Sequence, residues 1–118
     1  MHRAITAFLI AFALTGPAFA EGFQRVAEKD RFLQLIGERD LTRFAIRVKV
    51  TSGGDIVGRA FGQQVSGEWA WQDGYFCRSL FWGRQEIGDN CQTVEVLGET
   101  LRFTSDRGTG QFADLKLD

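Results

Sequence analysis

Histidine, proline and methionine each occur only once in this chain of 118 residues. All three lie within residues 1–20, which have the pattern of a cleavable signal peptide. The expected mature chain, residues 21–118, therefore has no histidine. Without histidine a chain cannot form a Ser-His or Cys-His nucleophile pair, or a His-ligated zinc or copper site. The sequence accordingly predicts no catalytic residue, no metal site and no cofactor.

The N-terminal segment has the three parts of an export signal. Arg3 gives it a positive start, residues 5–14 form an apolar run, and residues 18–20 (A-F-A) form a cleavage site before Glu21. The apolar run is too short to span a bilayer. We therefore expect a periplasmic or secreted protein with no membrane span in its mature chain.

The mature chain has no excess of positive charge. It keeps 13 of the 14 basic residues and all 15 acidic residues, so its formal charge is −2. This balance gives no electrostatic reason to expect a nucleic acid as partner. Residues 21–118 are enough for a single domain with a modest core.

Cysteine is also scarce. The two cysteines, Cys77 and Cys91, lie in the expected mature chain. An even number of cysteines in an exported chain favours a disulfide, whereas a free reactive thiol would lack a histidine partner. We expect one Cys77–Cys91 disulfide that closes the domain.

Hydrophobic periodicity predicts a mainly β domain. Residues 29–37 have helical spacing, with Asp30 as the expected N-cap, and the period changes to two after Arg39. The segment from Gly83 to Asn90 is expected to be a polar loop. The expected strands cover residues 44–51, 56–61, 65–71, 75–82, 91–96, 101–103 and 113–117. About seven strands at these spacings predict a small antiparallel meander, curled into a barrel or a sandwich, with one short N-terminal helix.

One expected hairpin contains the candidate ligand-binding residues. A three-residue loop at 72–74 would place Trp71 opposite Tyr75 and Trp69 opposite Cys77, on the core face. The other face of the fourth strand would then need a cover, either the N-terminal helix or a partner. That face contains Phe76, Arg78, Leu80 and Trp82.

Two further groups of residues allow alternative interpretations. Residues 105–110 (S-D-R-G-T-G) are either a phosphate-binding nest or a tight turn in which Asp106 bonds its own backbone. A group of four arginines either converges on an anion or protects exposed surface. These arginines are Arg78, Arg84, Arg102 and Arg107.

Three segments carry a family resemblance: S-G-E-W-A-W-Q-D-G-Y-F-C-R from Ser66, N-C-Q from Asn90, and R-F-T-S-D-R-G-T-G from Arg102. The chain resembles a group of short exported bacterial proteins of unknown function with a G-x-W…D-G-x-x-C…C pattern, some labelled dihydrodipicolinate reductase. The resemblance covers about half of the mature chain. It implies no catalytic residues here, because the mature chain lacks both histidine and an N-terminal G-x-G-x-x-G.

These observations lead to one main functional expectation and two alternatives. We expect a non-enzymatic module that binds an envelope protein or a small ligand through the aromatic face of the fourth strand. The first alternative is an NAD(P)H-dependent oxidoreductase, as the reductase label implies. The second is an envelope inhibitor or stability protein, by analogy of shape with small disulfide-closed barrels.

Overall fold

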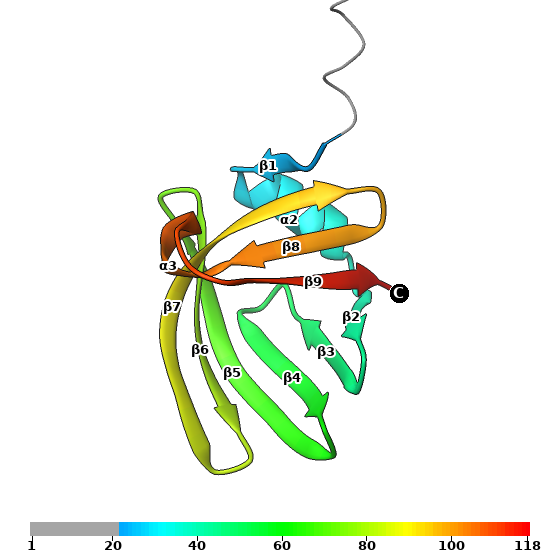
Figure 1. Cartoon of the computed structure of the whole chain (residues 1–118), viewed down its shortest axis with the longest axis vertical. Coiled ribbons are helices and arrows are strands. Elements are labelled where there is room, and N and C mark those ends of the chain that lie inside the picture. Colours follow the sequence, from blue (N-terminus) through cyan, green and yellow to red (C-terminus); the bar gives the residue numbers. More distant parts are fainter. Residues whose placement is uncertain (1–21) are drawn as a thin grey trace, which may run out of the picture.

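A computed structural model describes residues 22–118 of the protein. The predicted signal peptide and its cleavage site before Glu21 lie outside the described residues. The described residues form nine strands and two short helical segments (Figure 1). In chain order they are β1 (Gln24–Val26), α2 (Lys29–Ile36), β2 (Asp40–Arg43), β3 (Ile46–Val50), β4 (Asp55–Ala60), β5 (Gln63–Gln72), β6 (Tyr75–Trp82), β7 (Gln85–Leu97), β8 (Thr100–Thr104), α3 (Ser105–Gly108) and β9 (Phe112–Leu117).

Eight of the strands form a closed antiparallel barrel. Each strand from β2 to β9 pairs with the next one along the chain, and β9 returns to pair with β2. The short β1 pairs with β7 beyond the end of β6. The predicted mainly β meander, its single N-terminal helix and its disulfide are therefore confirmed, and the meander forms a barrel. The structure adds two short strands, β1 and β2, to the seven expected.

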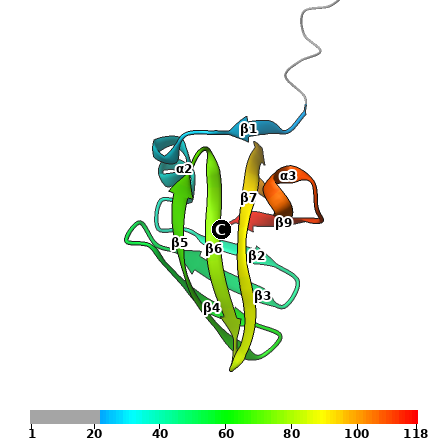
Figure 2. The ribbon, with the colours of Figure 1, turned by 90° about the vertical axis from the view of Figure 1, so that its left-hand side faces the viewer.

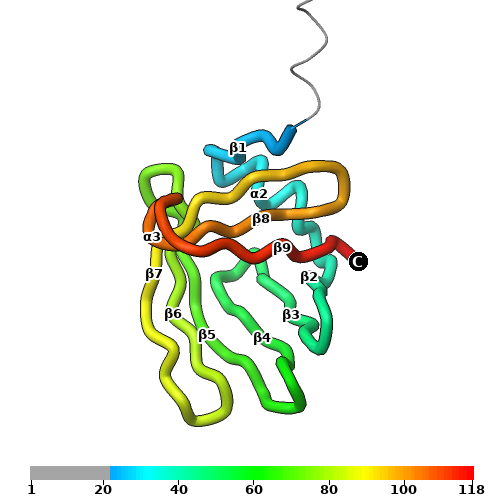
Figure 3. Tube along the Cα trace, in the orientation of Figure 1, coloured from blue at the N-terminus to red at the C-terminus, as the bar shows by residue number. Residues whose placement is uncertain are grey.

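The barrel is closed much more completely at one end than at the other. Residues 93–97 of β7 pair with β8, whereas residues 85–92 pair only with β6. On the far side, β9 joins β2 through two residue pairs, Leu41 with Leu117 and Thr42 with Lys116. In Figures 1 and 3 the strands β8 and β9 accordingly cross the upper part of the barrel, and the β4–β5 and β6–β7 hairpins extend below them.

Helix α2 covers the more closed end. Phe32 and Ile36 lie one turn apart, so they share a face of the helix, and both are buried. The Phe32 ring contacts four other aromatic rings, with centroids 5.0 to 6.4 Å away: Trp69, Trp71, Phe76 and Phe103. An eight-residue helix is too short to be stable alone, and this packing holds it in place. Its N-cap is Glu28 rather than the predicted Asp30.

The β5–β6 hairpin differs from the predicted register by one residue. Its loop has two residues, Asp73 and Gly74, both with positive φ, as a type I′ turn requires. Trp71 therefore lies opposite Phe76, and Trp69 lies opposite Arg78. Because side chains alternate along a strand, this slip exchanges the two faces. The prediction that the tryptophans share a face with Tyr75 and Cys77 was wrong.

The predicted polar loop at Gly83–Asn90 was also wrong. Residues 85–90 belong to β7, and the turn between β6 and β7 contains only Gly83 and Arg84. The polar composition is explained by exposure, because most side chains in this part of β7 are accessible to solvent. Apolar alternation, which the prediction relied on, is therefore absent there.

Candidate functional site

An apolar cavity of about 450 Å³, open to solvent on one side, lies on the concave face of β3 to β6, below β9. This size lies within the range of small-molecule sites, roughly 300–1,000 Å³. Within the described residues the lining has only two polar side chains, Arg78 and Gln92. The apolar lining residues are Leu41, Ile46, Val48, Val50, Ile56, Ala60, Phe61, Val65, Phe76, Leu80, Phe81, Trp82, Ile87, Phe103, Ala113 and Leu115.

The four residues predicted from the sequence all line this cavity. Phe76, Arg78, Leu80 and Trp82 are alternate residues of β6, so they do share one face. That face is the inner wall of the barrel rather than an exposed surface. Helix α2 packs against this face at Phe76, which contacts Phe32. The Trp82 indole N–H donates to the carbonyl of Ala60 on β4 at 2.8 Å.

Arg78 is the charged residue of the cavity lining. Its Nη1 donates to the carbonyl of Gly88 at 3.0 Å, and the side chain is about half buried. Burial lowers the pKa of the guanidinium, and the negative charge of Asp89 partly opposes this shift. Among residues 22–118 no carboxylate lies within 4 Å of it. Arg78 thus brings a positive charge without an ion-pair partner to an apolar cavity, and it also lines the groove on the outer face of β5, β6 and β7.

Gln92 is the second polar group in the lining and is only 8% exposed. Its Nε2 donates to the Ser105 hydroxyl at 3.1 Å, which ties β7 to the start of α3. Gln92 lies opposite Phe76 on β6, and Phe76 is two residues before Arg78 on the same strand. Gln92 was not predicted as a site residue, because a single glutamine within a strand gives no signal that distinguishes an inner from an outer position.

The opposite wall of the cavity was also not predicted as part of a site. Ile46, Val48 and Val50 on β3 alternate with polar residues, and this pattern indicated a half-buried strand. Which side chains they face across the barrel depends on the closure of β9 on β2. No local pattern indicates that pairing.

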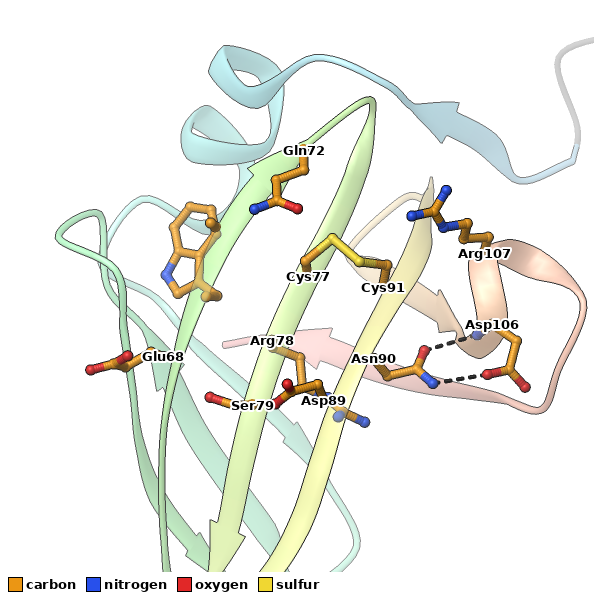
Figure 4. A pocket seen from close by; sticks show the side chains of 12 residues that line it. Glu68, Gln72, Cys77, Arg78, Ser79, Asp89, Asn90, Cys91, Asp106 and Arg107 are labelled. Atoms are coloured by element: carbon orange, nitrogen blue, oxygen red, sulfur yellow. Dashed lines mark hydrogen bonds between the residues drawn. A yellow bond between two sulfur atoms is a disulfide. The ribbon is translucent and has the colours of Figure 1, made fainter.

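Figure 2 shows β5, β6 and β7 side by side, with α3 next to β7. A second, shallower groove of about 730 Å³ lies on the outer face of these strands (Figure 4). The disulfide crosses its floor, and polar side chains surround it. Two of these are bonded to each other, since Asn90 Nδ2 donates to Asp106 Oδ1 at 2.9 Å and the Asp106 N–H donates to Asn90 Oδ1 at 2.8 Å. The groove has both polar and apolar surface and is more open, so it offers a small ligand less enclosed surface than the inner cavity does.

The disulfide predicted from the sequence is confirmed. Cys77 and Cys91 are bonded and form a directly opposed pair on β6 and β7. Ala70, rather than Trp69, lies opposite Cys77 on β5. The indole of Trp69 instead points to the buried side, where its N–H donates to the carbonyl of Thr51 at 2.8 Å.

The segment 105–110 is a turn that leads into β9. Asp106 and Arg107 both have left-handed φ values, near +55°. A tight turn was expected to have the Asp106 side chain bonded to its own backbone. The Asp106 carboxylate instead accepts a hydrogen bond from Asn90 Nδ2. Of the four arginines considered as an anion site, Arg78 and Arg107 both line the outer groove, and Arg78 also lines the inner cavity. Arg84 lies apart from them in the β6–β7 turn, and Arg102 is bonded to Asp114.

From residue 22 to 118, no group of three or more His, Cys, Asp or Glu side chains has an arrangement that would hold a metal ion. In the same part of the chain, none of the helices has the length and apolar character needed to cross a membrane. The disulfide is compatible with an oxidising compartment.

Comparison with known proteins adds no relative: no family model, no curated protein and no solved structure matches this chain. The resemblance to short exported proteins therefore stays a prediction.

Proposed function

We propose that this protein is a non-enzymatic binding module of the periplasm or the extracellular space. It holds a small apolar ligand with one anionic group inside the barrel. The observation that supports this proposal most is the position of Arg78. Its guanidinium is half buried and has no carboxylate partner among the described residues, and the rest of the cavity lining is almost entirely apolar.

The chemistry of the lining supports an amphiphile with a single negative charge. Burying a cation is costly unless an anion compensates it, and in this cavity a ligand carboxylate would do so. An arginine also binds a carboxylate through two parallel hydrogen bonds. The apolar walls of β3, β4 and β9 suit a hydrocarbon tail, because burial of apolar surface favours binding. A medium-chain fatty acid has both parts.

The test is titration of the purified, oxidised mature chain with three probes that share a twelve-carbon tail: dodecanoate, dodecanol and dodecyltrimethylammonium. Trp82 lines the cavity, so tryptophan fluorescence reports on its occupancy, and calorimetry gives the stoichiometry. We expect one saturable site with the order dodecanoate, then dodecanol, then the cation. Equal affinities for all three, or no saturable binding, would contradict the proposal.

The reductase function implied by the resemblance is tested in the same preparation. NADPH is added in place of the fatty acid, and binding is followed by calorimetry. Saturable binding in the micromolar range would contradict a non-enzymatic role and favour the oxidoreductase. Binding of dodecanoate without binding of NADPH would support the ligand-binding module.

A further inference from the structure

Three turns lie side by side at the open end of the barrel. The Phe61 N–H, in the β4–β5 turn, donates to the carbonyl of Ala45 in the β2–β3 turn at 2.8 Å. The Gly83 N–H, in the β6–β7 turn, donates to the carbonyl of Gln64 at the start of β5 at 2.7 Å. These bonds join the turns into one continuous end of the molecule, remote from helix α2.

This end exposes an apolar lip, made of Phe44, Phe61, Phe81 and Ile87. Phe44 is 87% exposed and Phe61 is 61% exposed, and their rings pack against each other with centroids 6.4 Å apart. Phe61, Phe81 and Ile87 also line the cavity, so the lip surrounds its mouth. Exposed apolar residues gathered in one patch mark an interaction surface, whereas isolated ones do not.

Each of the three turns also has an exposed arginine beside its apolar residue. These are Arg43 next to Phe44, Arg59 two residues before Phe61, and Arg84 three residues after Phe81. Among the described residues none of the three has a carboxylate within 4 Å. Asp114, the acid whose pKa Arg43 influences, is already bonded to Arg102.

The acidic side chains near these turns are fewer. Glu86, at the start of β7, is the single acid in the segments 43–46, 59–63 and 81–87. Three cations and one anion give the open end a net positive charge, although the mature chain as a whole is slightly negative. Positive charge and apolar side chains are therefore concentrated on the same surface.

We propose that the open end of the barrel docks on the surface of an anionic lipid bilayer. The apolar lip enters the boundary between headgroups and acyl chains, and Arg43, Arg59 and Arg84 bind lipid phosphates. Interfacial binding of this kind combines buried apolar area with attraction to anionic lipid. A second copy of the chain is a poorer occupant, because pairing two lips would bring six arginines together.

Docking goes beyond the proposed ligand binding and does not depend on it, since it needs the lip and the three arginines but not Arg78. The two properties are related by position. A docked lip would bring the cavity mouth to the bilayer surface, which is where apolar anionic ligands partition. Failure of one proposal would leave the other standing, because Arg43 and Arg84, varied in the docking test, do not line the cavity, and Arg78 does not belong to the lip.

The experiment is co-sedimentation of the oxidised mature chain with vesicles of phosphatidylcholine alone or with 30% phosphatidylglycerol (about 3 in 10 lipids, enough to give a strong surface potential). We expect binding to the anionic vesicles only, and its loss at high salt. Removing two arginines by R43Q/R84Q should weaken binding roughly 30-fold, since each contributes about a fivefold factor at the surface.

The matched control is K29Q/R31Q, which removes the same charge from exposed residues of α2 at the opposite end. This control should bind the vesicles like the parent protein. The F44S/F61S variant tests the lip, and circular dichroism checks that each variant is folded. Loss in the α2 control equal to that in R43Q/R84Q would overturn the proposal, as would the absence of binding to anionic vesicles.

Two other occupants of the lip are outcomes of the same set of measurements. Sedimentation velocity without lipid detects self-association, and a dimer that F44S/F61S abolishes would assign the lip to a second copy and overturn docking. Equal binding to both vesicle types, unchanged in R43Q/R84Q, would show adsorption without lipid selectivity and also contradict it.

Discussion

Arg78 has two opposing effects at a single position. Its guanidinium is half buried beside apolar side chains, and in the described structure it has one hydrogen bond, to Gly88. Without an anion such a group lowers the stability of the fold, because its hydration is lost on folding. With an anionic ligand the same group supplies affinity. Functional residues often show this exchange of stability for binding.

The variant Arg78→Met separates the two effects. Methionine keeps an unbranched, apolar side chain of moderate length, so the cavity wall is preserved while the charge is removed. We expect dodecanoate to bind about 10- to 100-fold more weakly, the range for loss of a hydrogen bond to a charged group. Dodecanol affinity should be unchanged, and the urea midpoint should be equal or higher.

Arg31→Gln is the matched control for that measurement. Arg31 is exposed on α2, so its removal changes the net charge equally without touching the cavity. Its dodecanoate affinity should equal that of the parent. A parallel loss of dodecanoate and dodecanol binding in Arg78→Met would mean that Arg78 shapes the cavity rather than recognising the anion.

At the scale of paired strands, the disulfide joins β6 to β7. Cys77 and Cys91 are directly opposed on β6 and β7, and 14 residues separate them along the chain. Closing a loop of this length stabilises a small domain by about 3 kcal/mol in the chain-entropy model. The loop lies entirely within the β6–β7 hairpin, which forms one wall of the cavity.

Replacing both cysteines by C77S/C91S should lower the free energy of unfolding by about 2–4 kcal/mol. Urea denaturation of the parent and the variant measures the difference. The parent protein, denatured without prior reduction, should have no thiol that reacts with a maleimide. Two labelled cysteines in that preparation, or equal stability of the variant, would contradict a structural disulfide.

A second strand pair gives a pH dependence. On β8 and β9, Arg102 donates two hydrogen bonds to Asp114, at 2.8 and 3.1 Å, and these lower the pKa of that carboxyl below its ordinary value of 3.8. A carboxyl with a lowered folded pKa stabilises the protein above the unfolded pKa. That stabilisation is lost as pH falls through the folded value.

We therefore expect the urea midpoint of the parent to fall as the pH is lowered below about 4. Asp114→Asn should remove part of that decrease, because its amide does not titrate. Thr42→Ala, on the neighbouring β2, serves as a control without a titrating group. Identical pH profiles for the parent and Asp114→Asn would contradict a contribution from the ion pair.

At the scale of elements, the sequence predicted the strands better than their register. The alternation along β6 correctly placed Phe76, Arg78, Leu80 and Trp82 on one face. The direction of that face depended on one residue of loop length at Asp73–Gly74, and both a two-residue and a three-residue hairpin fit the same glycine. A slip of one residue is enough to exchange inside and outside.

For the whole molecule, the cavity itself was not predictable from local patterns. The cavity exists because β9 returns to pair with β2, which lies far earlier in the chain, and because these two strands join through only two residue pairs. The mainly apolar segments of β3 and β4 gave correct strands but no sign that they face β6 across a space. Long-range closure of this kind leaves no periodic signal in the sequence.

A pair of matched substitutions can decide whether the ligand binds in the inner cavity or in the outer groove. Ala113 lies on β9 in the wall of the inner cavity, and Ala70 lies on β5 in the outer groove beside the disulfide. Phenylalanine at position 113 would fill part of the inner cavity and leave the outer groove unchanged, and phenylalanine at position 70 would do the opposite. Because the inner cavity has free volume, Ala113→Phe should keep the fold and its stability.

We expect Ala113→Phe to weaken dodecanoate binding at least about tenfold, since the added ring occupies space that the ligand tail needs. Ala70→Phe should leave that affinity unchanged. Calorimetry at constant pH and salt measures both, and the urea midpoints show whether each variant is folded. The reverse pattern would place the ligand in the outer groove, which Arg78, Asp89 and Arg107 line, and the inner cavity would lose its assigned role.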